Sequence, residues 1–330
     1  MQNTGIAIIG SGSAVPTACL SNQAMMDLVD TSDEWIKTRT GISQRHIAAA
    51  GATLSALATD ASRNAIAMAG ISASDIDLIL LTTSTPDDLF GSACQIQAAL
   101  GADKAVAFDL TAACSGFLFG LVTAAQYIKT GVFQNVLLIG ADVLSRWVDW
   151  QDRGTCVLFG DGAGAVVMQA NSSDRLLGFK LKSDGSQNHY LNLSYAADSQ
   201  ELTPGVTVSK GAYQAITMNG KEVYRFAVQS VPEVIDKALF NAQISTEQVD
   251  WLLLHQANQR ILDAVAQRLD IPKHKVISNL AQYGNTSAAS IPLALDEAVR
   301  AGKIQNNDII AASGFGAGLT WGAAIFRWGR

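Results

Sequence analysis

The two halves of this chain of 330 residues repeat one pattern of strands and helices. Residues 71–82, ISASDIDLILLT, align with residues 244–255, ISTEQVDWLLLH, at an offset of 173. The match continues at an offset of 171, where three residues of the first half recur in the second half. The pairs are Gly131 and Gly302, Gln134 and Gln305, and Asn135 and Asn306. An internal repeat limits the fold to one that packs two related units together. We therefore expect two halves, residues 1–170 and 171–330.

Short apolar runs that alternate with segments of helical periodicity indicate an α/β protein. Runs rich in valine, isoleucine and leucine predict buried strands at residues 77–82, 106–110, 136–140, 251–255, 276–278 and 309–312. Alternation of such strands with helices is typical of helices layered on largely parallel sheets. The alternative to a true repeat is chance similarity between two ordinary strand and helix units. A nearly constant register across several elements favours the repeat.

The composition indicates a compact protein that does not bind nucleic acid. Hydrophobic residues make up 48% of the chain and charged residues 16%, below the roughly 25% charged residues of globular chains. We therefore expect that a partner subunit covers part of the surface. The net charge of −6 argues against a sequence-independent grip on nucleic acid or on an anionic membrane, because both require a positive field.

The sequence predicts neither a membrane span nor a secretory signal. The longest strongly apolar stretch, residues 117–128, is interrupted by polar residues and is shorter than the roughly 20 residues that a span requires. The apolar run at residues 6–9 has no basic segment before it, which a signal peptide would have. We therefore expect a cytoplasmic protein.

Cys114 is the strongest candidate for a nucleophile. It lies in residues 106–117, VAFDLTAACSGF, where an apolar strand runs into small residues and then into a helix that begins near Ser115. Small neighbours let a substrate approach, and unpaired N–H groups at a helix N-terminus favour the thiolate. The alternative is a buried structural thiol.

The other three cysteines lack this setting. Cys19 falls in a polar stretch that predicts a loop, Cys94 in a helical segment and Cys156 in a strand-like run, so we expect structural or incidental roles for them. Four cysteines without C-x-x-C spacing predict neither a disulfide framework nor a zinc site.

His255 and Asn285 in the second half could complete a site with Cys114. Each is expected to follow a strand and to precede a helix. In the repeat register His255 matches Thr82, and Asn285 falls within about one residue of Cys114. Two related sheets that meet face to face would then bring all three residues to one pocket. Alone, a histidine at a strand end is more often structural, and an asparagine beside glycine is more often a turn former, so the combination carries the prediction.

The remaining histidines and the glycine-rich runs point to neither a metal nor a nucleotide. His46, His189 and His274 show no metal-ligand spacing. The glycine runs lack a Walker lysine and a complete G-x-G-x-x-G, and no G-x-S-x-G elbow of a serine hydrolase occurs. For residues 314–318, GFGAG, we expect a functional loop whose backbone N–H groups approach a reacting carbonyl.

Four motifs occur in order along the chain: TAACSGF around Cys114, HQAN at His255, YGNTSA around Asn285, and GFGAGLTWG at residues 314–322. In these motifs the chain resembles β-ketoacyl-acyl carrier protein synthase III, a family of the thiolase superfamily. The resemblance extends from Ile6 to the C-terminus. It implies a thiolase-like α/β fold of duplicated halves in five αβαβα layers, a homodimer, and the first condensation of type II fatty acid synthesis. In that reaction acetyl-CoA and malonyl-acyl carrier protein give acetoacetyl-acyl carrier protein, CoA and CO₂.

The same resemblance implies roles for the candidate site. Cys114 would take the acyl group as a thioester, and the N–H groups of Cys114 and Gly316 would hold the tetrahedral oxyanion. His255 and Asn285 would donate hydrogen bonds to the thioester oxygen of the malonyl group as it loses CO₂. No metal or cofactor is implied, because the CoA thioester is itself a substrate.

The resemblance also implies residues that bind acyl-CoA. Trp35 would lie against the adenine and Arg39 near the CoA phosphates, with Arg153 stacked on the other side. Phe90 would close the acyl pocket of the partner subunit, and Phe315 would line the acyl pocket. For Trp35 and Arg39 the alternative is the exposed face of an amphipathic helix.

By the same resemblance, Arg260 and Arg225 would bind the acidic carrier protein. Three other functions are considered. A relative in secondary metabolism would keep the three catalytic residues but use another primer or extender. The complete YGNTS motif disfavours a non-decarboxylating acyltransferase, and a non-catalytic partner subunit is disfavoured because every catalytic residue is present.

Overall fold

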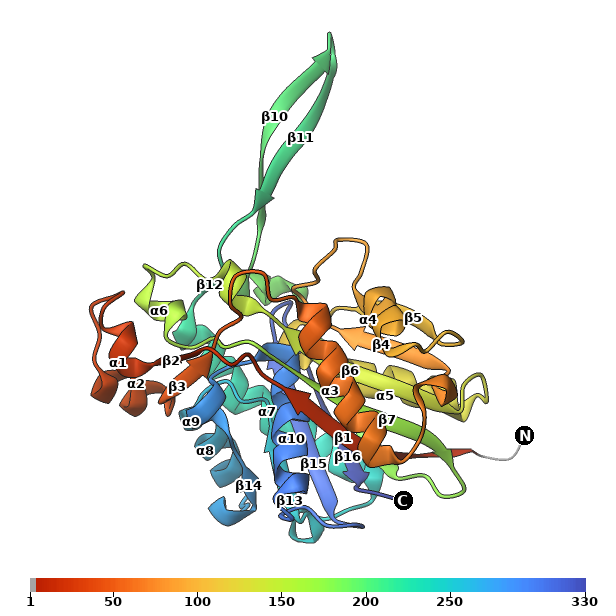
Figure 1. The fold of residues 1–330 in the computed structure, drawn as a ribbon. Coiled ribbons are helices and arrows are strands. Elements are labelled where there is room, and N and C mark those ends of the chain that lie inside the picture. Colours follow the sequence, from red (N-terminus) through yellow and green to blue (C-terminus); the bar gives the residue numbers. More distant parts are fainter. Residues whose placement is uncertain (1–3) are drawn as a thin grey trace.

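The computed structural model describes residues 4–330 and contains two five-stranded sheets, one in each half of the chain (Figure 1). The first sheet has the order β1-β7-β6-β4-β5 and is formed by β1 (Gly5–Ala14), β4 (Leu78–Thr82), β5 (Val106–Leu110), β6 (Asn135–Asp142) and β7 (Gly162–Asn171). The second sheet has the order β8-β16-β15-β13-β14 and is formed by β8 (Leu176–Ser183), β13 (Trp251–Leu254), β14 (Val276–Ile277), β15 (Ile309–Gly316) and β16 (Thr320–Arg327). All six strands predicted from the apolar runs are confirmed.

The two sheets also share their strand directions. In each sheet three strands run parallel, namely β5, β4 and β6 in the first and β14, β13 and β15 in the second. Beyond these three strands, each further strand pairs antiparallel with its neighbour. In the first sheet β7 pairs with β6 and β1 with β7, and in the second β16 pairs with β15 and β8 with β16. Thus β4 corresponds to β13 and β6 to β15. This correspondence supports our proposal that the chain is duplicated and divides near residue 171, between β7 and β8.

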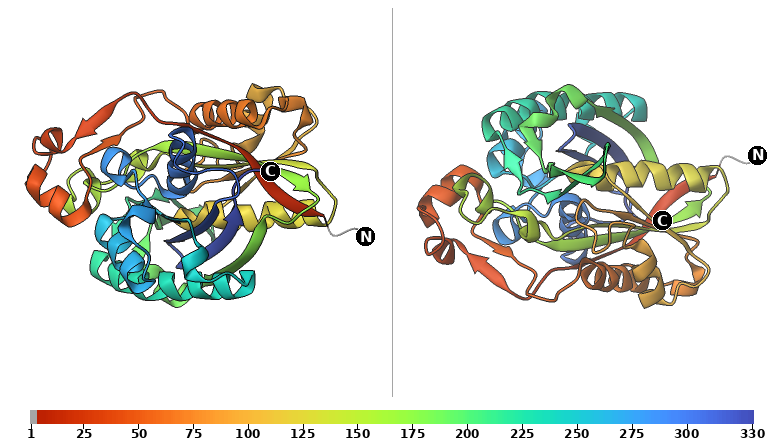
Figure 2. Two further views of the ribbon diagram at one scale, coloured as in Figure 1. Left: turned by 90° about the horizontal axis from the view of Figure 1, so that it is seen from below. Right: turned by 90° about the horizontal axis from the view of Figure 1, so that it is seen from above.

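Helices separate and cover the sheets in five layers (Figure 2). The central layer contains α5 (Gly116–Lys129) and α10 (Ser290–Arg300), which pack against strands of both sheets. The outer face of the first sheet is covered by α3 (Leu54–Ala69) and α4 (Ala93–Leu100). The outer face of the second sheet is covered by α7 (Gly220–Ala242) and α8 (Gln259–Arg268). The expected αβαβα arrangement is therefore confirmed.

Strands in this arrangement are buried on both faces. In β4, Leu78 and Leu80 face the central layer, whereas Ile79 and Leu81 face the outer helices, because side chains alternate along a strand. This explains why the sequence runs are continuously apolar rather than alternating. The central α5 is apolar around most of its circumference for the same reason.

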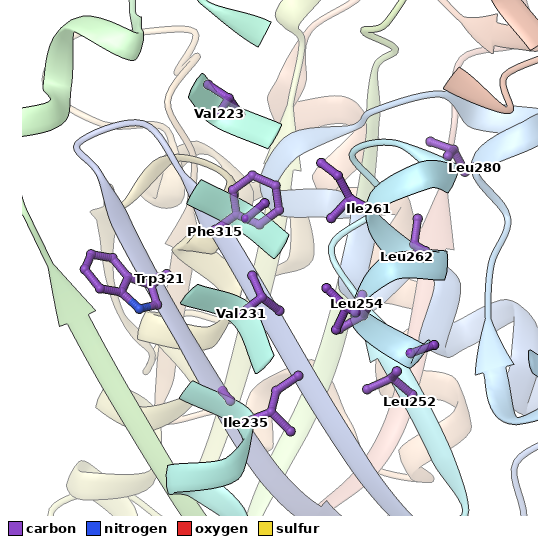
Figure 3. Packing of buried hydrophobic residues seen from close by; sticks show 14 of the residues in the cluster. Val223, Val231, Ile235, Leu252, Leu254, Ile261, Leu262, Leu280, Phe315 and Trp321 are labelled. Atoms are coloured by element: carbon purple, nitrogen blue, oxygen red, sulfur yellow. The ribbon is translucent and has the colours of Figure 1, made fainter. Parts of the chain in front are cut away.

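The second half repeats this packing. Leu253 faces the central layer, and Leu252 and Leu254 face outward. Figure 3 shows Val231 and Ile235 of α7 against this outer face. None of the helices in residues 4–330 is long and apolar enough to cross a membrane.

Two expectations about cysteines are wrong. Cys19 lies in the short strand β2 (Cys19–Ser21), which pairs with β3 (Gln44–His46), rather than in a loop. Cys156 ends the short helix α6 (Arg153–Cys156) rather than lying in a strand. The carboxylate of Asp152 accepts a hydrogen bond from the N–H of Gly154 at 2.8 Å, and this N-terminal cap favours a helix over the local strand propensity.

The surroundings of Asn285 also differ from the expectation. The helix α9 (Leu280–Tyr283) stands between β14 and Asn285, so Asn285 does not directly follow a strand. Further short helices near the N-terminus are α1 (Asn22–Met25) and α2 (Asp33–Thr40).

A long hairpin projects from the body of the molecule (Figure 1). It consists of β10 (Tyr195–Thr203) and β11 (Val206–Tyr213), and every residue of both strands is exposed. The short pair β9 (Leu191–Asn192) and β12 (Thr217–Met218) lies at its base. A two-stranded hairpin with neither face packed is only marginally stable in water, so this arm requires a further surface to pack on.

Candidate active site

Cys114 lies between the end of β5 and the start of α5. A single 3₁₀ turn, Ala113–Ser115, links the strand to the helix, and Ala113 adopts a left-handed φ of 47° there. Cys114 is 7% exposed. The end of β15 runs directly beside it, because a Cβ on Gly316 would lie 2.6 Å from the main-chain nitrogen of Cys114. A glycine is therefore required at position 316 for the two segments to approach.

Burial changes the chemistry expected for the Cys114 thiol. Burial, with a smaller contribution from the charge of Asp142, raises the pKa of Cys114 to about 12, although a hydrogen bond with Ser287 acts in the opposite direction. Removal from water disfavours the charged thiolate more than the helix N-terminus favours it. Burial thus acts against the thiolate that the helix N-terminus was expected to favour.

His255 follows β13 and is held on several sides. Its main-chain N–H donates to the carbonyl oxygen of Ser313 at 2.8 Å, and its Nδ1 lies 2.7 Å from Oγ of Ser290. The ring of Phe315 meets it edge to face at a centroid distance of 5.6 Å. His255 is 2% exposed, and burial lowers its pKa to about 3. The imidazole is therefore neutral at neutral pH.

Asn285 is fixed by its main chain and by its side chain. Its N–H donates to the carbonyl oxygen of Leu158 at 2.8 Å, and its own carbonyl accepts from the N–H of Gly160 at 3.0 Å. Its side-chain Oδ1 accepts from the N–H of Ser287 at 2.9 Å. This bond orients the amide so that Nδ2 remains available as a donor. The turn Ser287–Ala289, which follows Asn285, contacts the turn Ala113–Ser115 that carries Cys114.

The end of β15 lies between Cys114 and His255 and contacts both. Phe315 contacts the ring of His255, and the next residue, Gly316, lies against Cys114. Cys114, His255 and Asn285 are all buried. The structure thus brings a thiol, a neutral imidazole and an amide to neighbouring buried positions, although they come from widely separated parts of the chain.

Asp142 was not identified in the sequence analysis. This fully buried residue ends β6, and its carboxylate accepts hydrogen bonds from residues 83–85 of the first half. It also accepts from the N–H of Ala288 in the second half at 3.1 Å. Burial raises the pKa of Asp142, although these hydrogen bonds act against the shift. A carboxylate at the end of a predicted buried strand is the signal that could have identified it.

Ser287 and Ser290 were also missed. Both lie in residues 285–290, NTSAAS, and they contact Cys114 and His255 respectively. The clustering of small hydroxyl residues directly after Asn285 is a weak signal, because such residues are also common in turns.

Trp35 and Arg153 meet at the surface. The Cζ atom of Arg153 lies 4.9 Å from the centre of the Trp35 ring, and Arg153 also donates to the carbonyl oxygen of Asp30 at 2.7 Å. Arg39 is exposed on the same helix as Trp35, α2. Its carbonyl accepts from Asn258 at the start of α8 at 3.0 Å. The three candidate CoA-binding residues therefore lie in one region of the surface.

Arg260 and Arg225 lie exposed on α8 and α7. The guanidinium of Arg260 lies 5.3 Å from the centre of the Tyr224 ring. Arg225 forms an ion pair with Glu222 at 2.9 Å. Because Glu222 offsets the charge of Arg225, Arg260 is the stronger candidate for an anionic partner.

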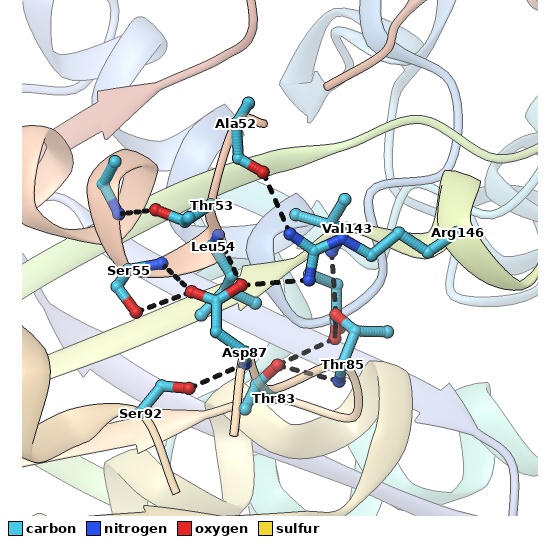
Figure 4. Close-up of polar contacts among 12 residues, drawn as sticks. Ala52, Thr53, Leu54, Ser55, Thr83, Thr85, Asp87, Ser92, Val143 and Arg146 are labelled. Atoms are coloured by element: carbon cyan, nitrogen blue, oxygen red, sulfur yellow. Dashed lines mark hydrogen bonds and ion pairs between the residues drawn. The ribbon is translucent and has the colours of Figure 1, made fainter. Parts of the chain in front are cut away.

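Phe90 is 99% exposed, in the loop between β4 and α4. Asp87 anchors this loop through its carboxylate, which accepts from the N–H groups of Leu54 and Ser55 and from Arg146 (Figure 4). Burial raises the pKa of Asp87, but these hydrogen bonds outweigh that effect and hold the pKa below its usual value. Phe90 therefore stands on a firmly held loop and lies outside the buried site of its own chain.

We expect the alkylation rate of Cys114 by iodoacetamide to rise about tenfold per pH unit between pH 7 and pH 9, because a thiol with a pKa of about 12 is far from half ionised there. Peptide mass spectrometry measures the rate, and the exposed Cys94 serves as the internal reference for reagent activity. A plateau for Cys114 below pH 9 would contradict the buried, protonated thiol.

Comparisons with known proteins agree with this arrangement. A family model described as "3-Oxoacyl-[acyl-carrier-protein (ACP)] synthase III" matches residues 108–185, and one described as the C terminal of the same synthase matches residues 239–328. A relative from Nostoc sp., called "Beta-ketoacyl-[acyl-carrier-protein] synthase III", is 77% identical over 100% of both chains. A relative of the same name from Trichodesmium erythraeum is 67% identical over 99% of this chain and 100% of its own.

Solved structures give the same result. The 3-oxoacyl-[acyl-carrier-protein] synthase III of Aquifex aeolicus is 44% identical, with a TM-score of 0.90 over 98% of this chain and 100% of its own. The corresponding synthase of Pseudomonas aeruginosa is 39% identical, with a TM-score of 0.89 over 99% of both chains. Identity at these levels along the whole length means that the chain belongs to the β-ketoacyl-[acyl-carrier-protein] synthase III family.

Proposed function

We propose that the protein condenses an acyl-CoA primer with malonyl-acyl carrier protein, with loss of CO₂, and so initiates fatty acid synthesis. The observation that carries this proposal is the enclosed site where Cys114 meets the backbone of Gly316 and the neutral donors His255 and Asn285. The names of the relatives, which are β-ketoacyl-acyl carrier protein synthases III, support the same reaction.

In the first step the sulfur of Cys114 attacks the thioester carbonyl of the acyl-CoA. Negative charge then develops on the carbonyl oxygen, and the N–H groups of Cys114 and Gly316 are placed to receive it. The bond to the CoA sulfur breaks, and CoA leaves with the proton that Cys114 gives up. Because the pKa of Cys114 is about 12, this proton leaves as the new bond forms rather than beforehand.

In the second step the malonyl thioester loses CO₂, and the electron pair moves onto its thioester oxygen. His255 and Asn285 each offer an N–H to that oxygen, and both are neutral donors. The resulting enolate attacks the acyl group on Cys114, the bond between the acyl carbon and the Cys114 sulfur breaks, and the condensed product leaves. The sulfur departs as a thiolate and takes a proton from water, so the cycle consumes one proton overall. We propose that no cofactor takes part, because hydrogen bonds to oxygen are sufficient to stabilise this charge.

We propose acetyl-CoA as the primer. The side chains of Leu118 and Ile291 lie 3.5 Å and 3.3 Å from where a Cβ on Gly314 would stand, close to the carbonyl of Cys114. We propose that these apolar side chains limit the room near Cys114 and so favour a short acyl group. The alternative is another primer in secondary metabolism. A solved priming β-ketosynthase of a polyketide pathway is 34% identical, with a TM-score of 0.91 over 99% of this chain and 97% of its own.

We further propose that the protein is a homodimer. Within residues 4–330, β5 is an edge strand that pairs with β4 on one side, and an open edge invites pairing with a second chain. Phe90 is 99% exposed near this edge. The hairpin β10–β11 extends on the same side of the molecule as the loop that carries Phe90 (Figure 1). In such a dimer Phe90 would reach the acyl pocket of the partner, and the hairpin would gain a surface to pack on.

The carrier protein would approach the surface of α7 and α8. An acidic enzyme with a net charge of −6 repels an acidic partner unless positive charge is concentrated at the docking surface. Arg260 supplies such a charge, whereas Glu222 neutralises that of Arg225.

The reaction is tested by separating its two steps. We expect Cys114→Ala to form no acyl-enzyme from labelled acetyl-CoA, while the control Cys94→Ala forms it normally. We expect His255→Ala and Asn285→Ala each to lower CO₂ release from malonyl-acyl carrier protein by about 10²–10³, the usual effect of losing one oxyanion donor, and to keep partial acylation. Label on Cys114→Ala, or normal CO₂ release in both other variants, would refute the proposed roles.

The primer and the dimer are tested together. Sedimentation should show a dimer, and a panel of acyl-CoAs should give the highest kcat/KM with acetyl-CoA. In an intact dimer, Phe90→Ala should shift this preference toward longer or branched primers, because it opens the partner's pocket. A monomer in solution would remove the structural basis of this role, and an unchanged primer profile in Phe90→Ala would contradict it. A preference of the unaltered protein for a non-acetyl primer would favour secondary metabolism.

Carrier docking is tested by charge reversal. Arg260→Glu should raise KM for malonyl-acyl carrier protein at least about threefold at low salt and weaken the dependence of KM on salt, because exposed charges are screened over about 10 Å at 0.1 M. Acylation by free acetyl-CoA should stay near normal. Arg225→Glu is the matched control and should have the smaller effect, because Glu222 already offsets that charge. Equal losses with both substrates in Arg260→Glu would mean that Arg260 supports the active site itself.

A further inference from the structure

We propose that Ser290 is a positioning residue that holds the proton of His255 on Nε2, so that His255 acts as a hydrogen-bond donor and not as a base. The proposal rests on the function proposed above and adds a residue to its site. Ser290 is the first residue of α10 and is 1% exposed. Its hydroxyl oxygen lies 2.7 Å from Nδ1 of His255.

The hydrogen bonds around Ser290 Oγ determine where its proton points. The main-chain N–H of Gln256 donates to this oxygen at 3.2 Å. In the part of the chain that the structure describes, the hydroxyl has two hydrogen-bond partners, this N–H and Nδ1 of His255. An N–H has no lone pair to accept a proton, so the hydroxyl can donate only to Nδ1.

The opposite arrangement leaves a group unsatisfied. If Nδ1 carried the proton and donated to Ser290, the hydroxyl hydrogen of Ser290 would have no acceptor among the described residues. A buried polar hydrogen without an acceptor is unfavourable. The arrangement in which Ser290 donates to Nδ1 satisfies every group, and it places the single proton of the neutral ring on Nε2.

The donor that fixes Ser290 is itself fixed. Gln256 is fully buried, and its side-chain Nε2 donates to the carbonyl oxygens of Leu254 at 2.7 Å and Ile277 at 3.3 Å. Its Oε1 accepts from the N–H of Asn279 at 3.2 Å. The ends of β13 and β14 therefore hold Gln256, whose N–H donates to Ser290. In this way the fold itself determines how the hydroxyl of Ser290 is oriented.

The segment 285–290 then determines which atoms of Asn285 and His255 are left to donate a hydrogen bond. The N–H of Ser287 occupies Oδ1 of Asn285 and leaves its Nδ2 to donate. The hydroxyl of Ser290 occupies Nδ1 of His255 and leaves the N–H at Nε2 to donate. With its proton on Nε2, His255 cannot take the proton of Cys114 through that atom. The proposal thus explains why acylation is expected to survive in part without His255.

The tautomer can be read directly by NMR of protein labelled with ¹⁵N-histidine. The chain has four histidines, and the signals of His255 are identified by their loss in His255→Asn. We expect an unprotonated Nδ1 and a protonated Nε2 in the unaltered protein. In Ser290→Ala we expect both signals to move toward the average of the two tautomers, because the donor to Nδ1 is gone.

Kinetics provide the second measurement. Ser290→Ala should lower kcat for CO₂ release from malonyl-acyl carrier protein about tenfold or more, which is less than the 10²–10³ of losing a donor outright. KM for malonyl-acyl carrier protein and acylation by acetyl-CoA should stay within about twofold, because binding and the first step do not use the N–H at Nε2. Ser290→Thr keeps the hydroxyl and should restore both the tautomer and kcat.

Ser313→Ala is the matched control. It removes another buried hydroxyl near His255, one that donates to the carbonyl oxygen of Gly322 at 2.7 Å, and it should leave the tautomer unchanged. The proposal is overturned if Ser290→Ala keeps the tautomer and kcat of the unaltered protein, or if it lowers acylation and CO₂ release equally.

The tautomer of the unaltered protein can be read without Ser290→Ala and without the reaction, because the signals of His255 are identified with His255→Asn. If Ser290→Ala fails to fold, a proton on Nδ1 in the unaltered protein still overturns the proposal, and a proton on Nε2 supports it. Absence of any CO₂ release by the unaltered protein would instead refute the proposed function and would leave the NMR test of Ser290 intact.

Discussion

The buried carboxylate of Asp142 joins the two halves of the molecule at the candidate active site. It ends β6 of the first half and accepts hydrogen bonds from the turn after β4 and from the N–H of Ala288 in the second half. Removing a carboxylate from water is unfavourable unless other donors replace the water. The segment 285–290 cannot move away without taking one of those donors from a buried charge. Asp142 therefore helps to fix where Asn285 and Ser290 lie relative to Cys114.

Close approach of main chains completes this arrangement. A Cβ on Gly140 would collide with the carbonyl oxygen of Ala288, and a Cβ on Gly316 would crowd Cys114. Both glycines are required for space. They stand at the ends of β6 and β15, which occupy equivalent places in the two sheets. The duplicated fold directs the ends of equivalent strands toward the same central layer, and in this way residues far apart in the sequence come to share one site.

The strands and their burial between helices were predictable, because a strand buried on both faces is a continuous apolar run and a repeat makes such runs recur. The number of layers followed from the resemblance to the synthase III family. The position of Cys114 between a strand and a helix was also predictable, since it is a local pattern, and its role as the nucleophile stays a prediction. The contacts of Asp142 and Ser290 were not predictable, because Ala288 is 146 residues from Asp142 and His255 is 35 residues from Ser290. The burial that raises the pKa of Cys114 was not predictable from the local pattern either, because part of it comes from Gly316 in the second half of the chain.

In the proposed reaction, negative charge develops on a thioester oxygen. The side chains of Cys114 and His255 beside it are both neutral beforehand. Burial keeps Cys114 protonated and His255 uncharged, so negative charge arises only as the thioester oxygen becomes an oxyanion or an enolate. The donors that receive it are already in place and need no reorganisation at that moment. Exclusion of water strengthens their interaction with the new charge. A more exposed Cys114 would ionise more readily, but its oxyanion would be screened by water. The raised pKa of Cys114 is therefore a consequence of the same enclosure that stabilises the intermediates.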